Sequence, residues 1–130
     1  EGISMSFTNF LETEILDHVF AGAAYTAPSA HYIALYTAAP GETGGGTELS
    51  GSAYARRPVV FATSGATTSN NAAVEWATAT GSWGTITHVG VFDAATSGNL
   101  MAYAALSASK AIATGDVFRI PSGDLDITLN

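Results

Sequence analysis

The side chains that could support catalysis or metal binding are few in this sequence and lie far apart. None of the three histidines, His18, His31 and His88, has a second histidine at the spacing of a metal-binding motif. Asp17-His18 could form part of a hydrolytic triad with one of the many serines, but no Gly-x-Ser-x-Gly motif supports this reading. We therefore interpret the histidines as structural residues and expect no catalytic residues, no bound metal and no cofactor.

Other patterns that can mark chemistry are incomplete. Glu12 and Glu14 fall on the predicted surface of a helix and are interpreted as solvated carboxylates. The run Gly44-Gly45-Gly46 lacks the lysine and the following helix of a phosphate-binding loop. The absence of cysteine excludes disulfides, thiolate metal sites and thiol nucleophiles. The sequence thus favours a protein that is not an enzyme.

Large aromatic residues give the one indication of ligand binding. Aromatic rings that converge on an open face can stack on sugars, which would make the chain a carbohydrate-binding module. The candidates for glycan contact are Trp76, Trp83, Tyr25 and Tyr54. The alternative is that these rings belong to the core, as large aromatic residues in strands usually do. Their burial decides between the two interpretations.

The charge of the chain and the length of its apolar runs each exclude one class of partner. It carries four basic residues against eleven acidic ones, a net charge of −7, and only 12% of its residues are charged. Proteins that bind nucleic acid concentrate lysine and arginine to displace phosphate counterions, and this chain does not. No apolar run approaches the roughly 20 residues of a membrane-spanning helix, so we expect no membrane insertion.

The length of 130 residues predicts a single domain. Residues 1–4 precede Met5, and we interpret them as a remnant of expression. We place one β-sandwich domain at residues 5–130.

One segment, from about Ser6 to Phe20, has helical periodicity. Ser6 or Thr8 can cap its start, and Gly22 is placed to end it. We expect its apolar stripe to pack across a sheet, so that Ile15→Asp would be severely destabilising. The stripe consists of Phe7, Leu11, Ile15 and Val19.

Most of the remaining chain has the composition of short strands separated by polar turns. Residues 31–37 are apolar on both faces, as in a central strand. Residues 84–93 and 100–103 form a predicted hairpin, in which Gly90 marks a crowded packing point. Pro58 indicates an edge or a bulge. The remaining expected strands are 52–61, 74–79, 117–120 and 125–129, and the expected outward loops are 41–47 and 63–71.

This pattern predicts a mainly β fold, an antiparallel, jelly-roll-like β-sandwich with one N-terminal helix packed on it. Few charges and a single proline protect the strand edges, so we expect at least one edge or face to meet another subunit.

The hairpin also carries a resemblance. Thr85-Ile86-Thr87-His88-Val89-Gly90-Val91-Phe92-Asp93, followed by Gly98-Asn99-Leu100, resembles a strand-turn-strand signature of small structural proteins of tailed bacteriophages, which are labelled tail-fibre or head-decoration proteins. The resemblance extends in order over Met5 to Asn130. The further matching segments are Leu16-Asp17-His18-Val19-Phe20, Ala24-Tyr25-Thr26-Ala27-Pro28, Tyr32-Ile33-Ala34-Leu35-Tyr36-Thr37, Glu48-Leu49-Ser50-Gly51 and Tyr54-Ala55-Arg56.

The resemblance implies a non-enzymatic virion structural protein that is exposed on the phage particle and acts by protein–protein packing. Its implied partners are phage capsid or tail proteins and copies of itself in a homotrimer. Head decoration and a tail-fibre-type module remain open alternatives. A carbohydrate-binding module that recognises a host surface glycan is the competing interpretation.

Overall fold

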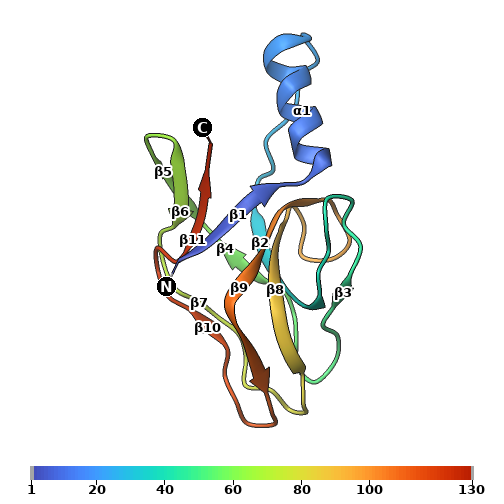
Figure 1. Ribbon diagram of the computed structural model, residues 1–130, viewed down its shortest axis with the longest axis vertical. Coiled ribbons are helices and arrows are strands. Elements are labelled where there is room, and N and C mark those ends of the chain that lie inside the picture. Colours follow the sequence, from blue (N-terminus) through green and yellow to red (C-terminus); the bar gives the residue numbers. More distant parts are fainter. Residues whose placement is uncertain (1, 130) are drawn as a thin grey trace.

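The computed structural model describes residues 2–129, and these form strands and one helix (Figure 1). In chain order the elements are β1 (Ile3–Phe7), α1 (Asn9–Phe20), β2 (His31–Ala38), β3 (Thr47–Glu48), β4 (Arg57–Val59), β5 (Phe61–Ser64), β6 (Thr67–Asn70), β7 (Val74–Glu75), β8 (Gly84–Phe92), β9 (Leu100–Ile112), β10 (Arg119–Ile120) and β11 (Leu125–Thr128). The prediction of a mainly β, sandwich-like fold with one helix is confirmed.

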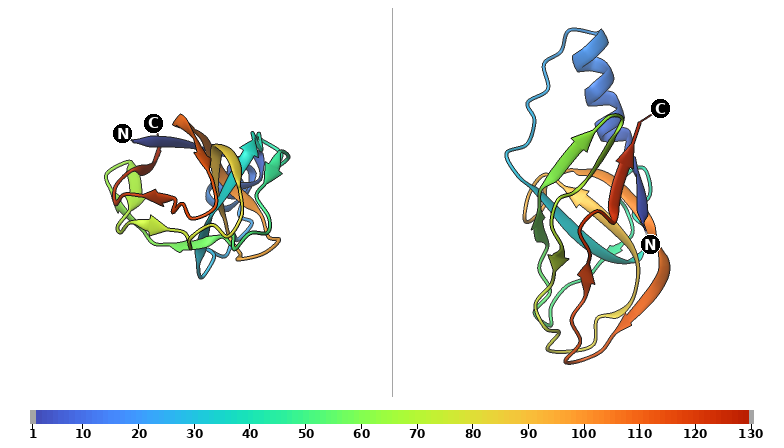
Figure 2. Two further views of the ribbon diagram at one scale, coloured as in Figure 1. Left: turned by 90° about the horizontal axis from the view of Figure 1, so that it is seen from below. Right: turned by 90° about the vertical axis from the view of Figure 1, so that its left-hand side faces the viewer.

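The short first strand joins two halves of a large sheet. Ile3 to Met5 of β1 pair in parallel with β11, whereas Ser6 and Phe7 pair antiparallel with β9. The strand order is β3-β2-β8-β9-β1-β11-β6-β5, with β4 also on β2 and with β7 and β10 as a separate pair. The sheet curves around its core when viewed along the long axis (Figure 2). Because β1 and β11 are parallel, the sheet is mixed and not wholly antiparallel; the jelly-roll label stays a prediction.

The sequence analysis missed β1, which starts two residues before the expected domain boundary. Ile3 and Met5 are buried and alternate with exposed Ser4 and Ser6, which is the period of a half-buried strand. Setting residues 1–4 apart concealed this alternation. Ile3 and Ser4 therefore belong to the fold.

The central strands β2, β8 and β9 are covered on both faces, as residues 31–37 predict. Ile33, Leu35 and Val89 belong to the main core between the two halves of the sheet. The opposite face carries a smaller cluster of Ala34, Tyr36, Phe92 and Leu100, which we call the outer cluster.

Gly90 lies at the centre of the outer cluster, between Ala34 of β2 and Tyr103 of β9. A Cβ atom at position 90 would lie 2.6 Å from Leu100 Cδ1 and 3.1 Å from Tyr36 Cε1. The prediction of a crowded packing point at this glycine is confirmed.

The helix is shorter than predicted and does not lie across the sheet. It begins at Asn9 and projects past the end of the strands, so that only its start is near the sheet (Figures 1 and 2). Leu11 is its buried residue, whereas Val19 is 59% exposed and Phe7 belongs to β1. Gly22, with φ of +75°, follows its end as expected. The helical periodicity indicates an apolar stripe, but it does not show whether another part of the chain packs over the second half of the helix. In the described residues Val19 and Phe20 stay exposed.

Two loop predictions have different outcomes. Residues 41–46 lie in the loop between β2 and β3, as expected, and Thr47 begins β3. Residues 63–71 contain most of a β-hairpin, because Gly65, with φ of +61°, turns β5 back to pair with β6. Pro58 lies in β4, which pairs with β2 alone, so its position on an edge is confirmed.

Gly90→Ala should lower the free energy of unfolding by about 1–3 kcal/mol, because the added methyl group must displace Leu100 or Tyr36 in a packed cluster. Gly45→Ala is the matched control, since its Cβ would meet the Pro40 carbonyl oxygen at 3.4 Å, an ordinary contact. Chemical denaturation measures both. Equal stability of the two variants would contradict the packing role of Gly90.

Candidate functional site

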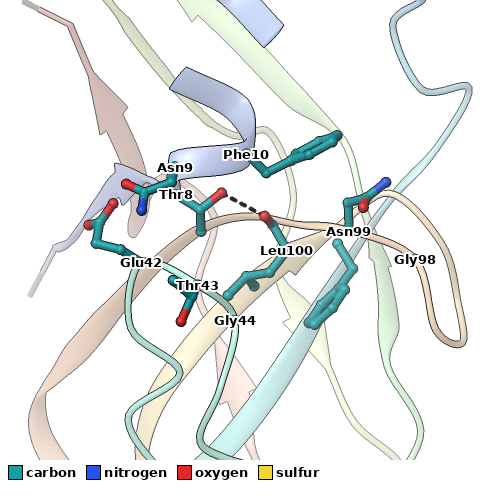
Figure 3. A pocket seen from close by; sticks show the side chains of 10 residues that line it. Thr8, Asn9, Phe10, Glu42, Thr43, Gly44, Gly98, Asn99 and Leu100 are labelled. Atoms are coloured by element: carbon teal, nitrogen blue, oxygen red, sulfur yellow. Dashed lines mark hydrogen bonds between the residues drawn. The ribbon is translucent and has the colours of Figure 1, made fainter. Parts of the chain in front are cut away.

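A polar pocket of about 250 Å³ lies where the start of α1 meets the two loops beside it (Figure 3). Three separate segments supply its wall: the β1–α1 junction, the loop between β2 and β3, and the turn between β8 and β9. The lining residues are Thr8, Asn9, Phe10, Glu42, Thr43, Gly44, Phe92, Gly98, Asn99 and Leu100.

Thr8 fixes the first segment of the pocket. It is 1% exposed and occupies the N-cap position of α1, for which the sequence offered Ser6 or Thr8. Its hydroxyl does not cap the helix but donates to the carbonyl oxygen of Leu100 at 2.7 Å (Figure 3), and its backbone N–H donates to Met101 O at 2.9 Å. The start of the helix is therefore anchored on β9.

Glu42 holds the second segment. Its carboxylate accepts the phenol hydrogen of Tyr103 at 2.9 Å, and its carbonyl oxygen accepts the N–H of Asn9 at 3.2 Å. The hydrogen bond to Glu42 raises the pKa of Tyr103, because it stabilises the neutral phenol. Gly46 closes this loop with φ of +79°, where a Cβ would lie 2.5 Å from Ala38 O. The loop is thus held against the sheet.

The third segment is the turn from Asp93 to Asn99. The carboxylate of Asp93 accepts the backbone N–H of Asn99 at 2.7 Å and its side-chain amide at 3.0 Å. Gly98 is required here, since a Cβ would lie 2.5 Å from Asp93 Oδ1. The pocket therefore has a framework that does not depend on a ligand.

A buried arginine packs against one wall of the pocket. The Arg56 side chain is 8% exposed and makes a two-point contact with Glu48, in which Nε and Nη2 each lie 2.9 Å from a carboxylate oxygen. Its Nη1 donates to the carbonyl oxygens of Ala94 and Ser97 at 3.0 and 2.7 Å. Its guanidinium carbon lies 3.5 Å from the ring centroid of Phe92, which lines the pocket.

Tyr54 extends this cluster towards the core. Its hydroxyl donates to Glu48 Oε2 at 2.7 Å and accepts the N–H of Leu35 at 3.0 Å. Burial, and then its contacts with Glu48, raise the pKa of Tyr54. Burial, with a smaller effect of Glu48, raises the pKa of Tyr36 to about 12. Both phenols therefore keep their protons at higher pH than an ordinary tyrosine does.

The four aromatic residues predicted to contact a glycan do not share an open face. Trp76 is 2% exposed and packs against Phe118, and Trp83 is 5% exposed with its indole N–H donating to Ser52 O at 2.9 Å. Tyr54 makes an edge contact with Trp83. Tyr25 lies apart, against Phe10 at the base of the helix. The two tryptophans are core residues, which corrects their assignment as candidate sugar contacts.

The residues of the pocket, in contrast, escaped the sequence analysis. Asn9, Glu42 and Asn99 are polar residues next to turns, and such residues occur in most loops. The composition of residues 41–47 was the one indication in the sequence. It predicted a loop but not that the loop forms part of a pocket. None of the pocket residues is a histidine, and the part of the chain that the structure describes has no cluster of acidic, histidine or cysteine side chains suited to a metal.

Comparison with known families decides what kind of protein this is. The model of the Gp80 family, described as Podophage GP4 fiber I protein gp80, matches residues 6–128. The chain belongs to the Gp80 family. No curated protein matches it significantly.

The Gp80 match has two consequences. It places the chain in a bacteriophage fibre family, which makes it a structural component of the virion, the class that the resemblance in the sequence predicts. It also spans the helix, the polar pocket and the Arg56 cluster, so these features lie within the family's domain. Within residues 2–129 of this Gp80-family chain, the helix is too short to span a membrane.

Arg56→Gln should lower the free energy of unfolding by about 2–4 kcal/mol, because it leaves the Glu48 carboxylate and the carbonyls of the 93–99 turn without their partner. Arg119→Gln is the matched control. Arg119 lies 3.8 Å from Glu75 with both side chains more than half exposed, so its loss should change stability by less than about 0.5 kcal/mol. Similar losses in the two variants, measured by urea denaturation, would disprove a special role for Arg56.

The fold should also lose stability as pH rises above about 10, the pKa of an ordinary tyrosine. In the unfolded chain the tyrosines ionise there, whereas Tyr36 keeps its proton up to about pH 12 and the pKa of Tyr54 is raised as well. Tyr54→Phe removes one of these groups, so its unfolding free energy should fall less steeply between about pH 10 and 12. Denaturation curves over this range compare the slopes. Parallel curves would show that Tyr54 does not contribute.

Proposed function

We propose that this chain is a non-enzymatic fibre-type protein on the surface of the virion, and that it assembles as a homotrimer through the free half of α1. The observation that carries the proposal is the exposure of apolar side chains on this helix. Leu16 is 58% exposed, Val19 59% and Phe20 82%. A helix gains stability by burying its apolar side chains, and these three are left exposed within the described chain.

The helix and the segment after it form a projecting arm, which we define as residues 9–30. Within the arm the backbone N–H of Tyr25 donates to His18 Nδ1 at 3.0 Å, and the rings of Phe10 and Tyr25 meet edge to face. These contacts hold the return segment along the helix (Figure 2). The arm therefore holds the exposed side chains of Leu16, Val19 and Phe20 in a defined arrangement.

A second copy of the chain supplies a suitable receptor for the arm. Between the β5–β6 hairpin and the sheet lie two adjoining apolar hollows of about 200 and 230 Å³, which share Thr68 and Ile127. An apolar cavity of about 150 Å³ accepts a benzene ring, so either hollow has room for the ring of Phe20. Their other large apolar side chains are Phe7, Phe61, Val91, Met101 and Leu129.

The symmetry of such a contact favours a ring. A projecting arm on one surface and a hollow on another make a heterologous interface, which closes into a cyclic oligomer when the rotation between neighbours permits. Three copies agree with the three-fold symmetry that the sequence resemblance implies. In this proposal the chain's role in the particle is packing against its own copies and against neighbouring fibre proteins.

Phe20→Ser should convert the oligomer to monomer, measured by light scattering at high micromolar concentration, because it removes the most exposed ring of the arm. Val117→Ser is the control, since Val117 is 44% exposed but lies outside the arm and the hollows. Leu129→Ser, at the rim of a hollow, should weaken the oligomer as Phe20→Ser does.

High salt should leave the wild-type oligomer intact, because apolar burial is not screened by ions. A wild-type protein that is monomeric at this concentration would contradict self-assembly. Dissociation in salt alone would show that the interface is ionic. Loss of the oligomer with Phe20→Ser but not with Leu129→Ser would place the receptor for the arm elsewhere.

A further inference from the structure

We infer that the polar pocket beside Thr8 binds one pyranose ring of a neutral saccharide. The pocket is formed within one chain, so this inference does not rest on the proposed homotrimer. The binding residues differ from the tryptophans and tyrosines that the sequence suggested. The evidence is the polarity, charge and size of the pocket.

The polar groups of the pocket match a ligand that is rich in hydroxyls. The carboxylate of Glu42 accepts hydrogen bonds, and the amides of Asn9 and Asn99 can both donate and accept. A sugar hydroxyl also does both, so adjacent hydroxyls of one ring can bond to a carboxylate and an amide together. Thr43 adds a hydroxyl to the wall.

The charge of the pocket excludes an anionic ligand. Its lining contains the carboxylate of Glu42 and no lysine, arginine or histidine. Arg56 lies beyond the Phe92 ring and is occupied by Glu48 and by two backbone carbonyls. A phosphate or a uronate would therefore meet a negative charge without compensation, whereas a neutral hexose would not.

The size and one wall of the pocket also suit a sugar ring. A volume of about 250 Å³ is below the range of about 300–1,000 Å³ in which drug-sized ligands bind, so a single six-membered ring is the largest unit that fits. The side chain of Phe10 stands over one side of the pocket (Figure 3) and offers an aromatic surface to the C–H groups of a pyranose.

The pocket is also fixed before any ligand arrives. Tyr103 holds the Glu42 carboxylate, Asp93 holds the Asn99 amide, and Thr8 anchors the backbone that carries Asn9. Binding therefore requires little ordering of the protein, which favours measurable affinity for a small ligand.

The test uses the full chain and a panel of glucose, galactose, mannose and N-acetylglucosamine, with binding followed by saturation-transfer NMR and by titration of amide chemical shifts. At least one sugar should bind with a Kd of about 1 mM or lower and shift the amides of residues 8–10, 42–44 and 98–100. A polysaccharide that carries the same sugar tests whether a terminal unit on a surface glycan is accepted as well as the free ring.

Asn9→Ala should weaken binding by about tenfold, the equivalent of one hydrogen bond. Glu42→Gln keeps an oxygen that can accept the Tyr103 hydrogen bond but removes the charge that strengthens a bond to a sugar hydroxyl, so it should also weaken binding by about tenfold. Thermal melting of both variants checks that the loops stay folded. Glu75→Gln and Asn71→Ala are the matched controls, since both residues are exposed and neither lines the pocket, and they should bind as the wild type does. Failure of every sugar to bind would overturn the inference. So would binding that survives both pocket variants, or preferential binding of a quaternary ammonium compound such as choline.

Discussion

The packing of Leu100 and Tyr36 over Gly90 is the contact on which the outer face of the protein depends. Because β8 has no side chain at this point, two large residues from neighbouring strands can meet above it. Leu100 is then held where its carbonyl oxygen accepts the Thr8 hydroxyl and anchors the start of α1. Phe92, in the same cluster, supports the guanidinium of Arg56. The arm and the pocket are thus both built on one crowded position.

The scarcity of charge explains how the loops are held. Ion pairs cannot fix them, because the chain has only four basic residues and Arg56 is committed to one internal cluster. Arg56 therefore connects several parts at once, since it bonds to Glu48 beside the β2–β3 loop and to the carbonyls of the 93–99 turn. Elsewhere glycines with positive φ and single side-chain bonds, such as Asp93 to Asn99, shape the turns.

The sequence was sufficient where local pattern and packing agree, and insufficient where a long-range partner decides. The strands at 31–37 and 84–92 and the role of Gly90 could be predicted, because their residues are buried on both faces whatever lies opposite. The parallel pairing of β1 with β11 could not, since it joins residues more than a hundred positions apart. The candidate site could not be predicted for the same reason. Residue type suggested Trp76 and Trp83 as binding residues, but both rings are buried in the core. The pocket is lined by loops that are distant in the sequence and are brought together only by the fold.

The error over α1 has a physical meaning of its own. Periodicity reports that one face of a helix is apolar, and it holds no information about which surface covers that face. Here Leu11 finds its cover within the chain, whereas Val19 and Phe20 do not. Burial within a chain and burial between chains are both driven by the hydrophobic effect. Apolar side chains left exposed in one copy therefore gain free energy when a second chain covers them. The proposed homotrimer would bury the exposed side chains of this half of the helix against a neighbouring copy, as expected for a family whose members are parts of a virus particle.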